Sequence, residues 1–189
     1  MSAVIARIIW RRLDIPGHDE AELNSSEDGS VLSGSANFVS NGQDCRFDYR
    51  IDCGPDWQTS RCTISGFVGS DSVSMAIERD RAGRWTVDRI DRPDLAGCED
   101  IDLSFTPATN LLPVRRLDLV VGERAEVRAA WVRFPELDVQ ILDQVYTRLD
   151  ANRFLYQSGD STFERILTVD QWGFVTEYPG LWITESISS

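Results

Sequence analysis

The chain has 189 residues, 42% of them hydrophobic, which suits one globular domain over residues 1–189 with a core of its own. Its formal net charge of −12 argues against nucleic acid and anionic lipid surfaces, since both bind clustered positive charge. All nineteen basic residues are arginine. A GC-rich genome explains most of that usage, but arginine is also the side chain best suited to bidentate contacts with small anions.

The beginning of the chain does not resemble a signal peptide, because Arg7 interrupts the apolar stretch 4–10. No apolar run approaches the ~20 residues of a membrane helix, so we expect a cytoplasmic protein without a membrane span. Metal and redox motifs need spacings such as CxxC, which the cysteines lack. We therefore expect free, buried thiols and no metal or other cofactor, while the oligomeric state stays open. The four thiols belong to Cys45, Cys53, Cys62 and Cys98.

The first half of the chain alternates between apolar and polar residues, which is typical of strands with one buried face. Residues 4–13 show this alternation clearly, and a Pro16-Gly17 turn follows them. Asp28-Gly29 and Asn41-Gly42 are hairpin signals between later strands. The expected strands of this half are 4–13, 19–26, 30–39, 44–52, 58–68, 72–80 and 84–89.

Residues 91–116 break this rhythm and carry three prolines without a regular period. A connection this long is usually functional or disordered, and its leucines favour order. A short helix around 107–112 is compatible with it. Residues 137–149 fit both a helical and a strand spacing, and we favour a strand. The strands expected after the irregular stretch are 124–134, 137–149, 153–158, 163–169, 173–178 and 181–185.

So many antiparallel strands must curl to protect their edges. We therefore expect a mainly β fold, a curved antiparallel sheet or half-barrel, with a few short helices or irregular loops over its concave face. Concave apolar faces are common sites for small ligands.

Catalytic signals are sparse. His18 is the single histidine and lies in a polar loop, and no GxSxG motif marks a nucleophilic serine. The acidic stretch 94–102 contains Asp100 and Asp102, and paired carboxylates of this kind serve glycoside hydrolases. A solvated loop, or pairing with nearby arginines, explains the same residues and is the interpretation that we favour.

Several aromatic residues have an arginine beside them, as in Trp10-Arg11-Arg12 and Arg84-Trp85. Trp and Tyr rings cover sugar rings and acyl chains, and arginine binds polar head groups or stacks on the rings. This combination suits an amphiphile with a sugar or anionic head. Strand alternation also predicts that at least half of these rings are core residues, with arginine on the opposite face.

Longer motifs carry a family resemblance across nearly the whole chain. They are Trp10-Arg11-Arg12-Leu13-Asp14, Tyr49-Arg50-Ile51-Asp52-Cys53 with Trp57 and Arg61, Asp94-Leu95-Ala96-Gly97-Cys98, Phe105-Thr106-Pro107-Ala108-Thr109-Asn110, Leu112-Pro113-Val114-Arg115-Arg116-Leu117, Trp131-Val132-Arg133-Phe134-Pro135 and Tyr178-Pro179-Gly180-Leu181-Trp182. With these motifs the chain resembles the bacterial glycolipid-binding family that was once catalogued as a domain of unknown function.

The resemblance implies a curved sheet similar to the half-barrels of bacterial lipoprotein carriers, and glycolipid binding without catalysis. On this basis we expect Thr109, Asn110, Arg115 and Arg116 near the ligand head and Trp10, Trp57, Trp131 and Tyr178 around its apolar part. The remaining candidate ligand-binding residues are Arg12, Tyr49, Arg61 and Arg133. Alternatively, the irregular stretch 91–116 only plugs the sheet, with Arg115 paired to Asp100 or Asp102.

Three functions stay open at this point. The leading one is a non-enzymatic binder of an amphiphile such as a glycolipid. The second is a hydrolase of a sugar or lipid ester that uses acidic residues near 94–102 or His18. The third is a protein-interaction module that offers an exposed sheet edge.

Overall fold

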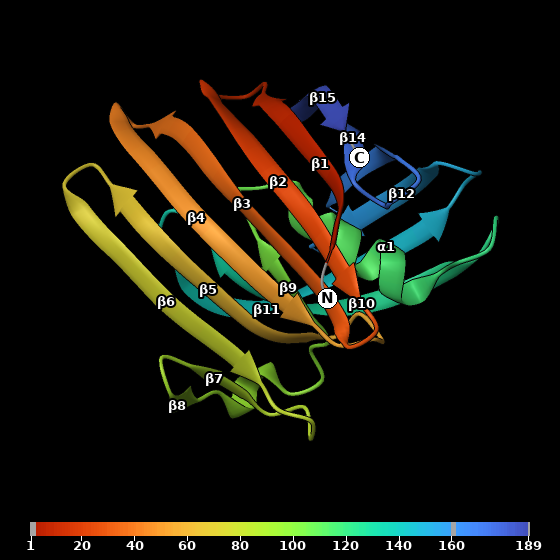
Figure 1. Cartoon of the computed structure of the whole chain (residues 1–189), viewed down its shortest axis with the longest axis horizontal. Helices are drawn as coiled ribbons and strands as arrows, with labels where there is room; N and C mark the ends of the chain where they lie inside the picture. The colour runs from red at the N-terminus through yellow and green to blue at the C-terminus, as the bar shows by residue number, and fades with distance from the viewer. Residues whose placement is uncertain (1–2, 160–161, 189) are drawn as a thin grey trace.

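Fifteen strands form one curved sheet in the computed structural model, which describes residues 3–159 and 162–188 (Figure 1). One short helix, α1 (Leu111–Leu117), lies inside the curve. The expected mainly β architecture, with short helical segments over the concave face, is thereby confirmed. In the described ranges, no helix has the length and apolar character that crossing a membrane requires.

The first half of the chain is a meander of long hairpins, drawn in red to yellow in Figure 1. Buried residues alternate with exposed ones along these strands, as the sequence predicts, because successive side chains point to opposite faces. The strands are β1 (Ala3–Arg12), β2 (Gly17–Ser26), β3 (Gly29–Ser40), β4 (Gln43–Cys53), β5 (Thr59–Val68), β6 (Asp71–Arg79), β7 (Trp85–Val87) and β8 (Ile90–Asp91).

The second half is another antiparallel meander that ends beside the first strand. Strand β15 pairs with β1, and the hydrogen bond from Leu13 N to Leu181 O (2.8 Å) extends this contact beyond the strands. The first and last strands therefore join the two meanders in the interior of the sheet. The strands are β10 (Arg124–Arg133), β11 (Asp138–Arg148), β12 (Arg153–Ser158), β13 (Phe163–Val169), β14 (Val175–Tyr178) and β15 (Trp182–Ser188).

The two outer strands of the sheet are short. β8 has two residues, and β9 (Asp100–Leu103), parallel to β10, has four. The start of β5 lies against β9: Thr59 N donates to Glu99 O (3.0 Å) and Ile101 N donates to Thr59 Oγ1 (3.2 Å). Short or covered edges discourage strand addition, so this arrangement gives little support to a module that binds partners through a sheet edge.

The segment after β9 fills the concave face. It forms the 3-10 turn η2 (Ala108–Asn110) and α1, whose Leu111 and Leu112 are fully buried. Phe105 stacks on Phe47 of β4, with ring centroids 4.5 Å apart. A second 3-10 turn, η1 (Pro93–Leu95), precedes β9.

The irregular segment contains more regular structure than its sequence predicts. Residues 107–112 were expected as one short helix, but the helical part runs from η2 through α1 to Leu117. Strand β9 was not expected, because four residues carry too little alternation to be recognised. Residues 137–149 form a strand, β11, in agreement with the interpretation that we favoured. All four cysteines are free and buried, as expected.

Candidate functional site

Five candidate ligand-binding residues lie in the packed interior: Trp10, Tyr49, Thr109, Asn110 and Tyr178. Trp10 is fully buried, and its Nε1 donates to Val175 O (2.5 Å). Thr109 Oγ1 accepts from Leu103 N (3.3 Å), and Asn110 Nδ2 donates to Tyr146 Oη (2.8 Å). Buried polar groups that are already hydrogen-bonded are typical of a core. These residues hold the concave face together.

Tyr49, another of these residues, belongs to a buried polar cluster. Its hydroxyl donates to Asp19 Oδ2 (3.1 Å) and lies 3.2 Å from Thr106 Oγ1, which also bonds Asp19. Burial raises the pKa of Asp19 to about 7, although the bonds from Thr106 and Tyr49 oppose this shift. The cluster ties strands β2 and β4 to the segment that plugs the sheet.

Tyr178 belongs to an aromatic cluster of the second meander. Its ring lies 6.2 Å from Tyr156, and Tyr156 lies 5.1 Å from Tyr146. Asp102 lies close by and accepts from Gln144 Nε2 (2.6 Å). Burial raises the pKa of Asp102 to about 6. This part of the interior is much more polar than the Phe-rich part near Phe47.

The two adjacent arginines of α1 behave differently. Arg116 points inward, where its Nη2 pairs with Asp100 Oδ2 (2.7 Å) and its Nη1 with Glu99 Oε2 (2.9 Å). The alternative that Arg115 pairs with Asp100 or Asp102 is therefore wrong, because its neighbour Arg116 holds Asp100. Arg115 is exposed and stacks on Trp57, with its Cζ 4.9 Å from the centroid of the ring.

Arg115 and Trp57 line a groove of about 550 Å³ at one end of α1. The guanidinium of Arg115 forms no ion pair with any residue in the described ranges. Its donors are thus fixed in direction by stacking but remain available to a ligand. The groove is lined by Trp57, Val114, Arg115, Asp118, Arg148, Ala151, Phe154, Val169, Asp170, Gln171 and Gly173.

Two backbone features build this groove. Trp57 has a φ of 65°, and its N–H donates to Gly54 O (3.0 Å), so a tight turn presents the indole to α1. Gly173 has a φ of +99°, and a Cβ there would lie 3.2 Å from Arg115 Cδ. The aliphatic stem of Arg115 therefore lies over a residue that has no side chain.

Asp170 fixes the turn beneath Arg115. Its Oδ1 accepts from the backbone N–H groups of Trp172, Gly173 and Phe174, each at 2.9 Å. Its Oδ2 is buried without a hydrogen-bond partner among the described residues. Burial raises the pKa of Asp170, while the backbone bonds and the positive charge of Arg115 lower it. Asp170 therefore holds the turn in place, while its buried Oδ2 is not exposed to the groove.

Arg148 forms the opposite wall and is fully engaged by backbone carbonyls. It donates to Leu119 O (2.6 Å), Ala151 O (3.0 Å) and Asp150 O (3.1 Å). Its guanidinium lies 5.7 Å from the ring centroid of Phe154. Arg148 therefore stabilises the fold. Among the described residues, no side-chain hydrogen bond or ion pair engages the Arg115 guanidinium, the Asp118 carboxylate or the Gln171 amide of the groove.

The remaining candidate residues lie away from the groove. Arg12 packs between Phe38 and Trp182 and pairs with Asp14 (2.8 Å). Arg61 pairs with Glu78 and Arg133 with Asp138, while Trp131 lies opposite Asp102 on the β9–β10 pair. The structure thus brings together Trp57 and Arg115 but does not gather the whole set around one ligand.

Sequence reasoning missed several groove residues. Asp118, Arg148, Phe154 and Asp170 belong to separate segments without a shared pattern. One local signal exists: an Asp followed three residues later by Gly, as in residues 170–173, is typical of a turn held by the Asp side chain.

A larger groove, of about 860 Å³, lies between the β6–β7 hairpin and η1. Its three main arginines are already bound to protein acceptors. Arg79 donates to Cys98 O and Gln58, Arg84 pairs with Asp80, and Arg92 pairs with Asp94. We prefer the smaller groove as the candidate site because its Arg115 keeps free donors.

The fold and the groove define a curved-sheet β domain with a closed interior and an arginine–aromatic site at its rim. The chain belongs to the family described as "Putative glycolipid-binding", whose model matches residues 7–183. The crystal structure of a DUF1089 family protein from Pseudomonas aeruginosa is similar, with a TM-score of 0.76 and 32% identity. The match covers 87% of this chain and 91% of that chain. No curated protein matches the chain. The resemblance seen in the sequence is thereby confirmed.

Proposed function

We propose that this protein binds an amphiphile with a glycosyl head group without catalysing a reaction, and that the head occupies the groove beside Trp57 and Arg115. The observation that carries the proposal is Arg115, whose stacked guanidinium keeps its donors free. Asp118 and Gln171 add acceptors and a further donor to the same groove. Sugar hydroxyls both donate and accept, so they suit such a mixed lining.

The groove suits the head of the ligand better than its tail. Arginine, carboxylate and amide groups form much of its lining, and transfer of an acyl chain onto such groups gains little. The concave face, where a small ligand was expected, holds the buried Leu111 and Leu112 of the protein itself. Trp10 and Tyr49 are engaged in that packing. We infer that the protein recognises the head group and leaves the acyl chains outside.

A hydrolase that uses Asp100 and Asp102 receives less support. Asp100 is buried and bound to Arg116, and Asp102 is bound to Gln144. A pair of catalytic carboxyl groups must reach the substrate from both sides of the scissile bond. Carboxylates committed to protein partners are poorly placed for that task.

Titration with octyl β-glucoside below its micelle concentration tests the proposal, followed by NMR of the arginine Nε–H and tryptophan Nε1–H resonances. We expect the resonances of Arg115 and Trp57 to shift. Loss of a charged donor typically costs enough to weaken binding about tenfold, which we expect for Arg115→Ala. Arg89→Ala, which changes an exposed arginine of the β7–β8 turn that does not line the groove, is the matched control. Equal affinity of the two variants would remove Arg115 from the site.

A further inference from the structure

The turn between α1 and β10 exposes two adjacent apolar side chains. Val120 is 60% exposed and Val121 is 59% exposed, and Leu149 on the β11–β12 turn is 37% exposed. We call these three residues the apolar tip. Single exposed apolar residues are common on protein surfaces, but a turn normally carries polar residues. Two neighbouring valines at the end of a projecting turn therefore need an explanation.

Hydrogen bonds hold the turn that carries the apolar tip in one conformation. Glu123 N donates to Val120 O (2.9 Å), and the Glu123 carboxylate accepts from Val120 N (2.9 Å). Gly122 N donates to Arg148 O (2.8 Å), and Arg148 N donates to Glu123 O (2.9 Å). These bonds fix the turn against β11. The valines are thus held outward by a closed set of hydrogen bonds.

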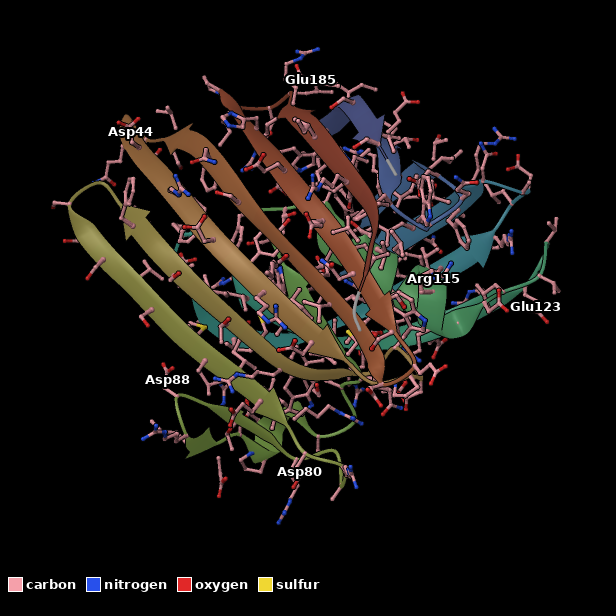
Figure 2. All side chains as sticks on the ribbon, viewed as in Figure 1. Asp44, Asp80, Asp88, Arg115, Glu123 and Glu185 are labelled. Atoms are coloured by element: carbon pink, nitrogen blue, oxygen red, sulfur yellow. The ribbon has the colours of Figure 1, made fainter. Side chains whose placement is uncertain are left out.

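The apolar tip is continuous with the groove. Arg148 lines the groove and also donates to Leu119 O, next to Val120. Asp118 lines the groove from the first residue of the same turn. Figure 2 shows Arg115 and Glu123 on the same side of the molecule, with Glu123 near the projecting end. Anything that covers the apolar tip therefore lies beside the opening of the groove.

We propose that the apolar tip enters the surface of an electrically neutral lipid layer and thereby brings the groove to a glycosyl head group whose acyl chains stay in the layer. This inference rests on the proposed function. It also follows from the filled concave face, which leaves the acyl chains no place inside the protein. A protein that recognises only the head group of a lipid must bind that lipid at the surface of the layer in which its acyl chains are embedded.

The charges around the apolar tip favour a neutral surface. Arg153 pairs with Asp150 (2.6 Å), and Arg124 lies 3.5 Å from Glu126. Glu123 adds a carboxylate, and the whole chain has a net charge of −12. Attraction to anionic lipids needs an excess of basic residues near the surface, which this region lacks. We therefore expect binding to zwitterionic lipid and no gain from anionic lipid.

The experiment is flotation of the full chain with phosphatidylcholine vesicles, with and without added monoglucosyl diacylglycerol. The test variant is Val120→Ser/Val121→Ser. The matched control is Ile90→Ser, which changes a 68% exposed residue on the distant β8. We expect the tip variant to lose about fivefold or more of its partition onto plain vesicles, as removal of apolar contact predicts, and the control to bind as the unchanged protein does.

The two proposals fail in different ways. Plain vesicles test the apolar tip alone, whereas octyl β-glucoside in solution tests the groove alone. The tip variant should keep its glucoside affinity and its circular dichroism spectrum. Equal flotation of the tip variant and the unchanged protein would overturn the inference. So would a dimer that the tip variant abolishes in sedimentation without vesicles, because the apolar tip would then contact a second copy of the chain.

Discussion

Arg115 lies across the ring of Trp57 with its stem over Gly173, so one side chain joins the helix to two turns far away in the sequence. The stack orients the guanidinium without using its hydrogen-bond donors. An ion pair with a carboxylate would fix the same group but consume those donors. The arrangement is thus suited to a cation that must remain ready for a ligand.

Trp57→Ala should release Arg115 from this orientation. A partly exposed cation–π contact contributes about 0.5–1 kcal/mol, so we expect glucoside affinity to fall about two- to fivefold. Trp57→Phe should retain most of the affinity because it keeps an aromatic face. Calorimetric titration of both variants checks this, and equal losses for Phe and Ala would contradict the role of the ring.

Gly173→Ala should weaken binding through Arg115. The new Cβ lies 3.2 Å from Arg115 Cδ, so the Arg115 side chain must move. The alanine must also adopt a φ of +99°, which strains the backbone. Gly180→Ala is the control, because Gly180 has a φ of +79° but no heavy atom within 4 Å of its added Cβ. Both should lose about 1–2 kcal/mol of stability in urea unfolding. Only Gly173→Ala should reduce glucoside affinity.

Arg116→Ala and Arg115→Ala should separate a structural from a binding arginine. Removing Arg116 leaves the buried Asp100 without its partner, which typically costs about 3–5 kcal/mol. Arg115 is exposed and loses only its stacking contact with Trp57, so its removal should cost about 0.5–1 kcal/mol. Urea unfolding of the two variants measures the contrast. A similar loss for both would mean that Arg115 also supports the fold.

The titration of Asp19 should lower the free energy of unfolding as the pH rises from about 4 to 7. Its pKa is about 7 in the folded protein and near 3.8 when unfolded, so the folded state holds the proton more tightly. The stabilisation is complete below the unfolded pKa and is lost between about pH 4 and pH 7, by up to about 4 kcal/mol. Asp19→Asn does not titrate, so its stability relative to the unchanged protein should rise over this range. Urea midpoints across the range test it, and parallel curves would contradict the burial of a protonated Asp19.

The strands were largely predictable because the alternation of apolar and polar residues is a local property of the sequence. Whether an apolar row faces a ligand or a packed core was not predictable, because it depends on what covers the sheet. Trp10 illustrates this: its alternation indicated an inward face, but the residues that contact its ring, Phe174 and Val175, lie near residue 175 and share no local pattern with it. The resemblance located residues 105–117 as important without revealing that they fill the concave face.

The groove was harder to predict than the fold. Trp57, Arg115, Arg148 and Asp170 meet only after the sheet has curled, and no local pattern encodes such long-range contacts. Arg115 and Arg116 show the limit most clearly. Adjacent positions of a helix point about 100° apart, so one faces Asp100 and the other faces solvent. Which arginine would face inward depended on the direction of α1 in the finished fold.

The pairing of β1 with β15 has a consequence for the order in which the protein assembles. During synthesis the first meander emerges early and can form its hairpins, because each of its strands pairs with a neighbour in sequence. Strand β1 must then wait with one side unpaired until residues 182–188 of β15 have been made. Trp10 also waits, because its acceptor, Val175 O, lies near the other end of the chain. The middle of the finished sheet is therefore the last part to close, and truncation within the final strand would leave its longest unprotected edge at the centre of the molecule.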